Sequence, residues 1–159
     1  MVKLLYYIDK IHLIEYGRFV TNDTYIKLPY GPVPTKTLDI INSKSNLFED
    51  EKKYIFKYLS FSNDNTRTIT SKTEPDLNEL SKSEIAVIDS VIKDYGKYPA
   101  NKLVDLIHQE NAYKKAGNHD CISILDIIAD LPDDRKTELL EIIQEDSETN
   151  QILHDFKLC

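Results

Sequence analysis

The segment at residues 29–34, with the sequence Pro-Tyr-Gly-Pro-Val-Pro, constrains the fold of this chain more than any other feature. It holds three of the six prolines. Each proline fixes its φ angle near −65° and has no backbone N–H, so the segment is excluded from a helix interior and from a central strand of a sheet. A helix is expected to start at about Pro34, whose fixed φ suits a first helical position, and to reach Asn42.

Two other regions favour extended structure. Residues 24–28, just before the prolines, are short and rich in β-favouring side chains. Residues 54–61 are dense in aromatic and β-branched side chains, residues 62–65 supply turn chemistry, and residues 66–71 again favour a strand. The sequence therefore predicts a β-hairpin over residues 54–71.

Helical periodicity characterises the N-terminus and the second half of the chain. Apolar residues at three- and four-residue spacings predict a first helix that ends near Gly17 and buries Leu5 and Ile8, with Lys3 facing solvent. One of the two adjacent tyrosines, Tyr6 or Tyr7, is expected in the core beside them.

Later helices begin and end at recognisable signals. Ser81 and Glu84 form a capping-box pattern for a helix that Gly96 closes. Another helix is expected after Pro99, a buried one over residues 122–131 and, beyond Pro132, an acidic amphipathic one. A chain of 159 residues suits one compact domain. The sequence thus predicts an α+β fold, a mainly helical single domain (residues 1–159) with a small antiparallel β-hairpin or sheet.

The charge distribution narrows the range of partners. The formal net charge is −7, and residues 126–148 account for all of it, with nine acidic and two basic residues. Because no basic stripe remains elsewhere, nucleic acid is not an expected partner. Two interpretations of the acidic residues 126–148 stay open. They attract a basic partner at long range, or they form a solvated helix face without a binding role.

Several features predict a cytoplasmic protein. Asp9 and Lys10 interrupt the N-terminal apolar stretch before it reaches signal-peptide length, and no stretch approaches about 18 apolar residues, so no membrane partner is expected. The two cysteines, Cys121 and Cys159, define no disulfide framework, which fits a reducing compartment better.

Patterns that would indicate catalysis or a cofactor are missing. The chain has four glycines and neither a nucleophile elbow nor a phosphate-binding loop. Asp9 and His12 form an acid–base pair or a structural hydrogen bond. His108, His119 and Cys121 lack zinc-binding spacing. We therefore expect no catalytic residues, no metal and no cofactor, and keep a small enzyme that uses His12 or His108 as the alternative class.

Binding of a protein partner is the favoured class of function. Five of the ten tyrosines lie in the first thirty residues, and tyrosine provides the large amphipathic contact area that interfaces favour. Tyr30 adjoins a stiff turn that loses little entropy on binding. A structural turn that packs against the helices is an equally open interpretation. Arg18 and Asp23 flank a short loop. They are interpreted either as a recognition pair for the partner or as an exposed ion pair without a binding role. The predicted partner-binding residues are Arg18, Asp23, Tyr25, Tyr30, Gly31, Pro32, Val33 and Pro34.

A family resemblance rests on five segments taken together. They are Lys3-Leu4-Leu5-Tyr6-Tyr7-Ile8-Asp9-Lys10 with His12-Leu13, Tyr16-Gly17-Arg18 with Asp23-x-Tyr25, Tyr30-Gly31-Pro32-Val33-Pro34, Leu80-Ser81-Lys82-Ser83-Glu84 through to Tyr95-Gly96, and Leu103-x-Asp105-Leu106-x-His108-x-Glu110 before Ala112-Tyr113-Lys114. In this order and spacing they resemble the Panacea domain, also called the SocA-like antitoxin domain, over residues 3–116. The acidic, helical C-terminal part, residues 121–159, is not covered.

The resemblance implies a mainly helical domain with a small sheet, encoded by bacteria and phages. Its members typically bind and neutralise a cognate toxin protein encoded beside them, and the alternative role is that of an adaptor that delivers its partner to a protease. Because members often carry an additional helix before the first of these segments, part of the family core is expected to be absent or replaced. The expected function is that of an antitoxin and not of an enzyme.

Overall fold

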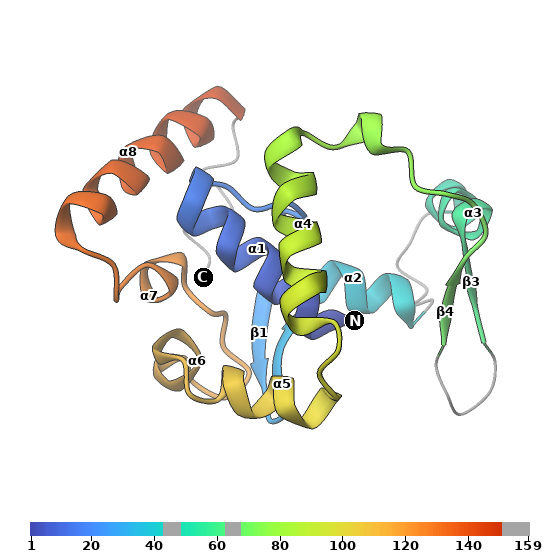
Figure 1. Ribbon diagram of the computed structural model, residues 1–159, viewed down its shortest axis with the longest axis horizontal. Helices are drawn as coiled ribbons and strands as arrows, with labels where there is room; N and C mark the ends of the chain where they lie inside the picture. Colours follow the sequence, from blue (N-terminus) through green and yellow to red (C-terminus); the bar gives the residue numbers. More distant parts are fainter. Residues whose placement is uncertain (43–48, 63–67, 151–159) are drawn as a thin grey trace.

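The structure, a computed structural model, describes residues 1–42, 49–62 and 68–150 (Figure 1). Its elements, in chain order, are α1 (Val2–Tyr16), β1 (Tyr25–Leu28), β2 (Gly31–Pro34), α2 (Thr35–Ile41), α3 (Glu49–Tyr58), β3 (Leu59–Phe61), β4 (Ile69–Ser71), the 3₁₀ helix η1 (Leu77–Glu79), α4 (Lys82–Tyr95), α5 (Ala100–Ile107), α6 (Asn111–Lys115), α7 (Ile124–Ile127) and α8 (Asp133–Asn150). Two small antiparallel pairs of strands accompany the helices. The fold is therefore mainly helical α+β, as predicted.

β1 and β2 form a hairpin in which Tyr25 pairs with Pro34 and Leu28 pairs with Gly31. The sequence did not predict a strand over the prolines. The exclusion from a central strand nevertheless holds, because β2 has one strand neighbour within the described part of the chain. Residues 119–122 run along the other edge of β1, where the Ile122 N–H donates to the Tyr25 carbonyl at 2.8 Å and the His119 N–H donates to the Lys27 carbonyl at 3.0 Å.

The predicted hairpin over residues 54–71 is wrong in its first half. Tyr54–Tyr58 belong to α3, and the strands β3 and β4 are confined to Leu59–Phe61 and Ile69–Ser71. Alternating aromatic residues suggested a strand, but the preceding residues 49–53 are all charged, and four of the five are the good helix formers Glu and Lys. Of the predicted turn, residues 63–65 lie outside the described residues.

The helix signals in the second half are largely confirmed. The Ser81 hydroxyl accepts from the Glu84 N–H, and the Glu84 carboxylate accepts from the Ser81 N–H, so the capping box is complete. α5 begins after Pro99 and α8 begins after Pro132. The helix expected over residues 122–131 is shorter, with α7 limited to Ile124–Ile127, and α6 was not predicted.

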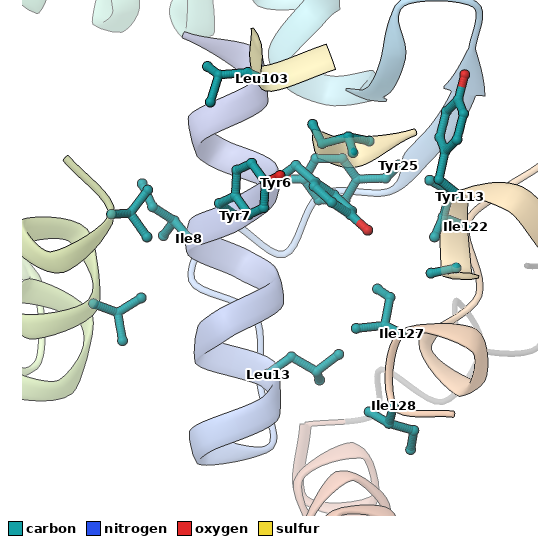
Figure 2. Packing of buried hydrophobic residues seen from close by; sticks show 14 of the residues in the cluster. Tyr6, Tyr7, Ile8, Leu13, Tyr25, Leu103, Tyr113, Ile122, Ile127 and Ile128 are labelled. Atoms are coloured by element: carbon teal, nitrogen blue, oxygen red, sulfur yellow. The ribbon is translucent and has the colours of Figure 1, made fainter. Parts of the chain in front are cut away.

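α1 lies at the centre of the molecule, packed against α4 and the β1–β2 hairpin (Figures 1 and 2). Both N-terminal tyrosines are in the core: Tyr6 is 1% exposed and Tyr7 is 4% exposed. They join core residues of α4, Val87 and Val91, and residues of the C-terminal part such as Leu139. Residues inside and outside the region of family resemblance thus share one hydrophobic cluster.

Lys3 departs from the expectation that it faces solvent. Its side chain is buried at 9% exposure, because α1 turns this position towards the hairpin, where its Nζ donates to the Pro32 carbonyl at 2.8 Å. Leu5, expected to be buried, is only partly so, whereas Ile8 is in the core as predicted. The buried face of α1 therefore includes Lys3 and Ile8 and is turned away from Leu5, which the sequence pattern had placed on it.

The structure also describes the helix lengths that matter for a membrane span and one of the two cysteines. No helix in the described part of the chain is long and apolar enough to span a bilayer. Cys121 is disulfide-bonded, a bond that the sequence analysis did not predict. Cys159 lies outside the described residues.

Candidate partner-binding surface

The tip of the β1–β2 hairpin presents Tyr30 to solvent. Its side chain is 79% exposed, the largest value among the large hydrophobic residues that the structure describes. Gly31 follows with φ +99°, a conformation that favours glycine, and it lets the chain enter β2. A Cβ atom at Gly31 would also meet the Lys3 side chain at 3.2 Å. The backbone conformation therefore favours glycine at this position, and a side chain would also displace Lys3 slightly.

Buried and partly buried polar contacts hold the hairpin tip from both sides. From α6, the Tyr113 hydroxyl donates to the Leu28 carbonyl at 2.8 Å. The Lys27 Nζ lies 4.7 Å from the centroid of the Tyr113 ring and donates to the Ala116 carbonyl at 2.8 Å. On the β2 side, the Lys3 Nζ holds the Pro32 carbonyl. The backbone that carries Tyr30 is thus fixed before any partner arrives.

Burial changes the electrostatics of Lys3. It lowers the pKa of the ammonium group from 10.5 to about 8, because the charged form loses hydration. No sequence signal distinguished Lys3 from the other lysines.

Asp23, predicted to contact a partner, is a structural residue in this fold. Its side chain is 4% exposed. One carboxylate oxygen accepts the Lys36 N–H at 2.9 Å, and the other accepts the Thr37 N–H and the Thr37 hydroxyl, each at 2.8 Å. Asp23 thereby satisfies free donors in the first turn of α2, a role that its sequence position before the prolines did not reveal.

Tyr25 is likewise buried, at 3% exposure, and donates from its hydroxyl to Asp9 Oδ2 at 2.8 Å. Burial, reinforced by the negative charge of Asp9, raises the pKa of the Tyr25 hydroxyl. Asp9 also accepts the Val20 N–H at 2.8 Å and the N–H and hydroxyl of Thr21. This carboxylate therefore links α1 to the chain that leads into β1.

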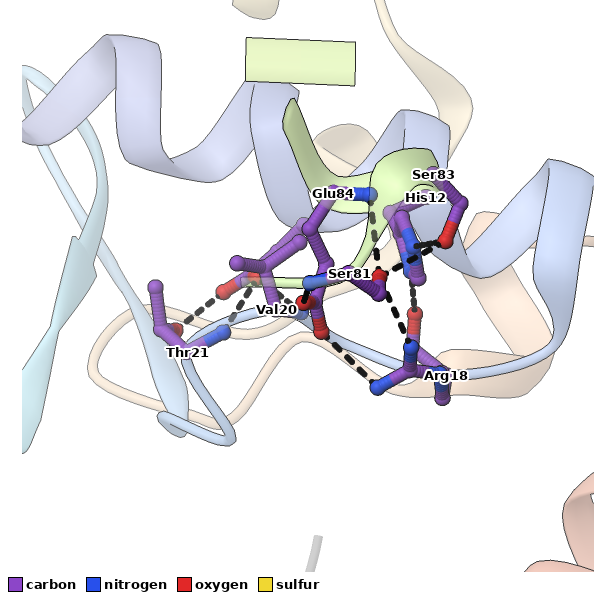
Figure 3. A network of polar contacts seen from close by, with 8 residues as sticks. His12, Arg18, Val20, Thr21, Ser81, Ser83 and Glu84 are labelled. Carbon is purple, nitrogen blue, oxygen red and sulfur yellow. Dashed lines mark hydrogen bonds and ion pairs between the residues drawn. The ribbon is translucent and has the colours of Figure 1, made fainter. Parts of the chain in front are cut away.

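Arg18 belongs to a polar network that joins the end of α1 to the start of α4 (Figure 3). Its guanidinium lies 2.8 Å from Glu84 Oε1 and 3.3 Å from the Ser81 hydroxyl. The hydrogen bond from the Ser81 N–H is the main cause that lowers the pKa of the Glu84 carboxyl group. The positive charge of Arg18 lowers this pKa further. The fully buried His12 contacts the Arg18 carbonyl through Nδ1 at 2.8 Å and the Ser83 hydroxyl through Nε2 at 3.2 Å. The partner of Arg18 is thus Glu84, whereas Asp23 bonds to α2.

The residues weighed for catalysis or metal binding have other surroundings. Asp9 and His12 each bond to separate groups in the networks above. Among the described residues, no group of three or more His, Cys, Asp and Glu side chains is placed to hold a metal ion. A shallow cavity of about 150 Å³ is lined by polar residues that include Lys10, Glu110 and Asp130, and neither His12 nor His108 lines it.

The predicted partner-binding residues thus fall into two groups. Tyr30 is exposed, the Arg18 side chain is 42% exposed, and Val33 is partly exposed. The remaining five are buried: Asp23, Tyr25, Gly31, Pro32 and Pro34. The arrangement is a single exposed aromatic side chain on a braced hairpin, which suits contact with another macromolecule more than chemistry on a small one.

A comparison with protein-family models places this fold in a known class. The model of the antitoxin SocA-like Panacea domain matches residues 1–114. The chain therefore belongs to the SocA-like Panacea domain family, as its sequence motifs indicated. No curated protein matches the chain, and no solved structure does.

Proposed function

We propose that the protein is an antitoxin that binds a cognate toxin protein and neutralises it. The observation that carries the proposal is the family match over residues 1–114, which contain α1, the β1–β2 hairpin, α4 and α5. The role is one of binding and not of catalysis. Because such a toxin is made in the same cell, its encounter with the antitoxin takes place in the cytoplasm.

The hairpin tip is the contact that we assign to the toxin. An exposed tyrosine on a fixed backbone loses little conformational entropy when a partner covers it, and tyrosine is enriched among the residues that dominate binding energy. Tyr30 has both properties, through its 79% exposure and the bonds to Leu28 and Pro32 on either side. Gly31, Pro32 and Pro34 shape the tip from within, and Val33 and Arg18 lie partly exposed.

Co-expression with the product of the neighbouring reading frame tests this role. The wild-type protein should restore growth, and Tyr30→Ala should weaken toxin binding by about 2 kcal/mol, roughly 30-fold, in calorimetry. The melting temperature should not change, because the Tyr30 side chain is exposed. Leu125→Ala, which truncates a side chain that is 62% exposed on α7, is the matched control.

Two results would contradict the proposal in different ways. Unchanged toxin affinity in Tyr30→Ala, with a normal melting curve, would remove the hairpin tip from the interface. Protection that disappears in cells without housekeeping proteases, while the toxin remains bound, would identify an adaptor for proteolysis instead of a direct neutraliser.

A further inference from the structure

The segment formed by α3, β3 and β4, called here the α3 lobe, differs from the rest of the molecule in its packing. None of its described side chains is buried. α3 packs mainly against β3, and β3 pairs with β4. In Figure 1 the lobe lies at the edge of the molecule, on the opposite side from α8. No residue of the α3 lobe that the structure describes thus belongs to the buried core cluster.

Four aromatic residues in this lobe form two ring pairs. Phe56 and Phe61 have ring centroids 5.7 Å apart in an edge-on arrangement, which joins α3 to β3. Tyr54 and Tyr58 are four residues apart on one face of α3, with ring centroids 5.0 Å apart. At 3.6 residues per turn, Phe56 lies on the opposite face of the helix. One pair therefore serves the packing of the lobe, and the other points away from it.

The tyrosine pair is too exposed to be explained by the fold. Tyr54 is 67% exposed, and Tyr58 is only partly buried. Large aromatic side chains that are exposed next to each other mark sites of interaction in soluble proteins. Tyrosines in particular provide rigid contact area with few rotatable bonds. The Tyr54–Tyr58 face of α3 therefore has the character of an uncovered protein interface.

Positive charge lies at the C-terminal end of this face. The Lys57 Nζ lies 5.0 Å from the centroid of the Tyr58 ring. The Lys72 Nζ donates to the Phe56 carbonyl at 2.6 Å, which places a second ammonium group at the C-terminal end of α3. The acidic residues of α3 occupy its first three positions, residues 49–51, and its lysines all follow. The Tyr58 end of the pair is thus cationic, whereas at the start of α3 the Asp50 carboxylate lies 3.7 Å from the Lys53 ammonium group.

We infer that the Tyr54–Tyr58 face of α3 docks a carboxylate-bearing surface of the toxin. Carboxylates of the toxin pair with Lys57 and Lys72, while its apolar atoms cover the two tyrosine rings, so that charge and shape are complementary. The inference rests on the antitoxin role proposed above. It adds a second contact, which is separate from the hairpin tip, and it states the chemistry of the toxin surface.

Calorimetry with the purified toxin and the full-length protein tests the inference. Tyr54→Ala should weaken binding by about 10-fold or more without a change in melting temperature. Lys57→Glu should also weaken binding, and its effect should shrink at high salt because the attraction between charges is screened. The controls are Leu125→Ala on α7 and Lys97→Glu in the turn between α4 and α5, which change exposed side chains outside the α3 lobe. Both controls should bind as the wild type does.

Each other result overturns the inference in a recognisable way. If the wild type binds the toxin and both α3 variants bind equally well, the docking surface is wrong and the antitoxin role stands. If the wild type does not bind the toxin at all, the docking surface and the antitoxin role are both wrong. Self-association in sedimentation experiments that is lost in Tyr54→Ala would assign the face to a second copy of the chain. Binding to vesicles of anionic lipid that is lost in the same variant would assign it to a membrane.

Discussion

Single buried polar residues hold together the elements that carry Tyr30. Lys3 supports the hairpin through its hydrogen bond to the Pro32 carbonyl. Asp9 accepts hydrogen bonds from the chain before β1, and His12 connects the end of α1 to the start of α4. Each is almost fully buried, and each is hydrogen-bonded, so its desolvation is partly offset. These three positions are therefore more sensitive to substitution than their polar character suggests.

Lys3 gives the protein a measurable pH dependence. Its pKa falls from 10.5 in the unfolded chain to about 8 in the folded protein. Between these values the unfolded state holds a proton that the folded state has lost, so stability should rise with pH, by at most about 1.4 kcal/mol per pH unit. Urea denaturation at pH 7.5 and pH 9.5 should show this rise in the wild type and not in Lys3→Met. Lys97→Met, at an exposed position, should behave as the wild type, and a rise that persists in Lys3→Met would rule out Lys3 as its source.

Individual elements were predictable where a local signal fixes them. The capping box at Ser81, the glycine at the end of α1 and the prolines before α5 and α8 each act within a few residues, and each marked the boundary expected of it. β2 was missed because its state depends on a partner strand, and α3 was missed because its alternating aromatic residues were considered without the charged residues before them. β2 pairs with β1, and α3 aligns aromatic rings that resemble a strand when only alternation is considered.

The same contrast applies to the candidate binding surface. Tyr30 was identified from its stiff surroundings, and the structure places it in solvent. Asp23 was grouped with it as a recognition partner of Arg18, and Tyr25 as one of the five tyrosines in the first thirty residues. Their bonds to α2 and to Asp9 arise only when the chain folds back, which no local pattern encodes.

The N-terminal cap of α4 provides a test at the scale of one element. Ser81→Ala removes the acceptor for the Glu84 N–H and for the Arg18 guanidinium, and should cost about 1–2 kcal/mol of the free energy of unfolding. Ser90→Ala, at an exposed position inside α4, should change it by less than about 0.5 kcal/mol. Chemical denaturation measures both. Equal effects of the two substitutions would show that the cap does not stabilise the helix.

At the scale of the whole molecule, the C-terminal part supports the region that defines the family. The Arg135 guanidinium donates to the Ile14 and Glu15 carbonyls at 2.9 and 2.8 Å. These carbonyls lie in the last turn of α1, where the helix itself provides no donor for them. Gly17 lies so close to α8 that a Cβ there would meet the Ile142 side chain at 2.5 Å. We therefore propose that the chain folds as one domain.

Removal of the Arg135 contact tests this proposal. Arg135→Ala should lower the free energy of unfolding by about 1–2 kcal/mol, because two charge-assisted bonds to α1 are lost. Lys136→Ala, which removes only an ion pair with the neighbouring Asp133, should have an effect below about 0.5 kcal/mol. Calorimetric melting should show a single transition in the wild type and in both variants. Two transitions would contradict a single domain.

The central place of α1 has a consequence for the protein during its synthesis. Tyr7 and Leu13 are made first, but the core residues that they join, such as Val91, Ile128 and Leu139, lie some 80 to 130 positions later. At a translation rate of about 5–20 residues per second, the apolar face of this helix waits on the order of ten seconds for those partners. Throughout that interval the nascent chain is open to chaperones and proteases, and the core around α1 is complete only when α8 has left the ribosome.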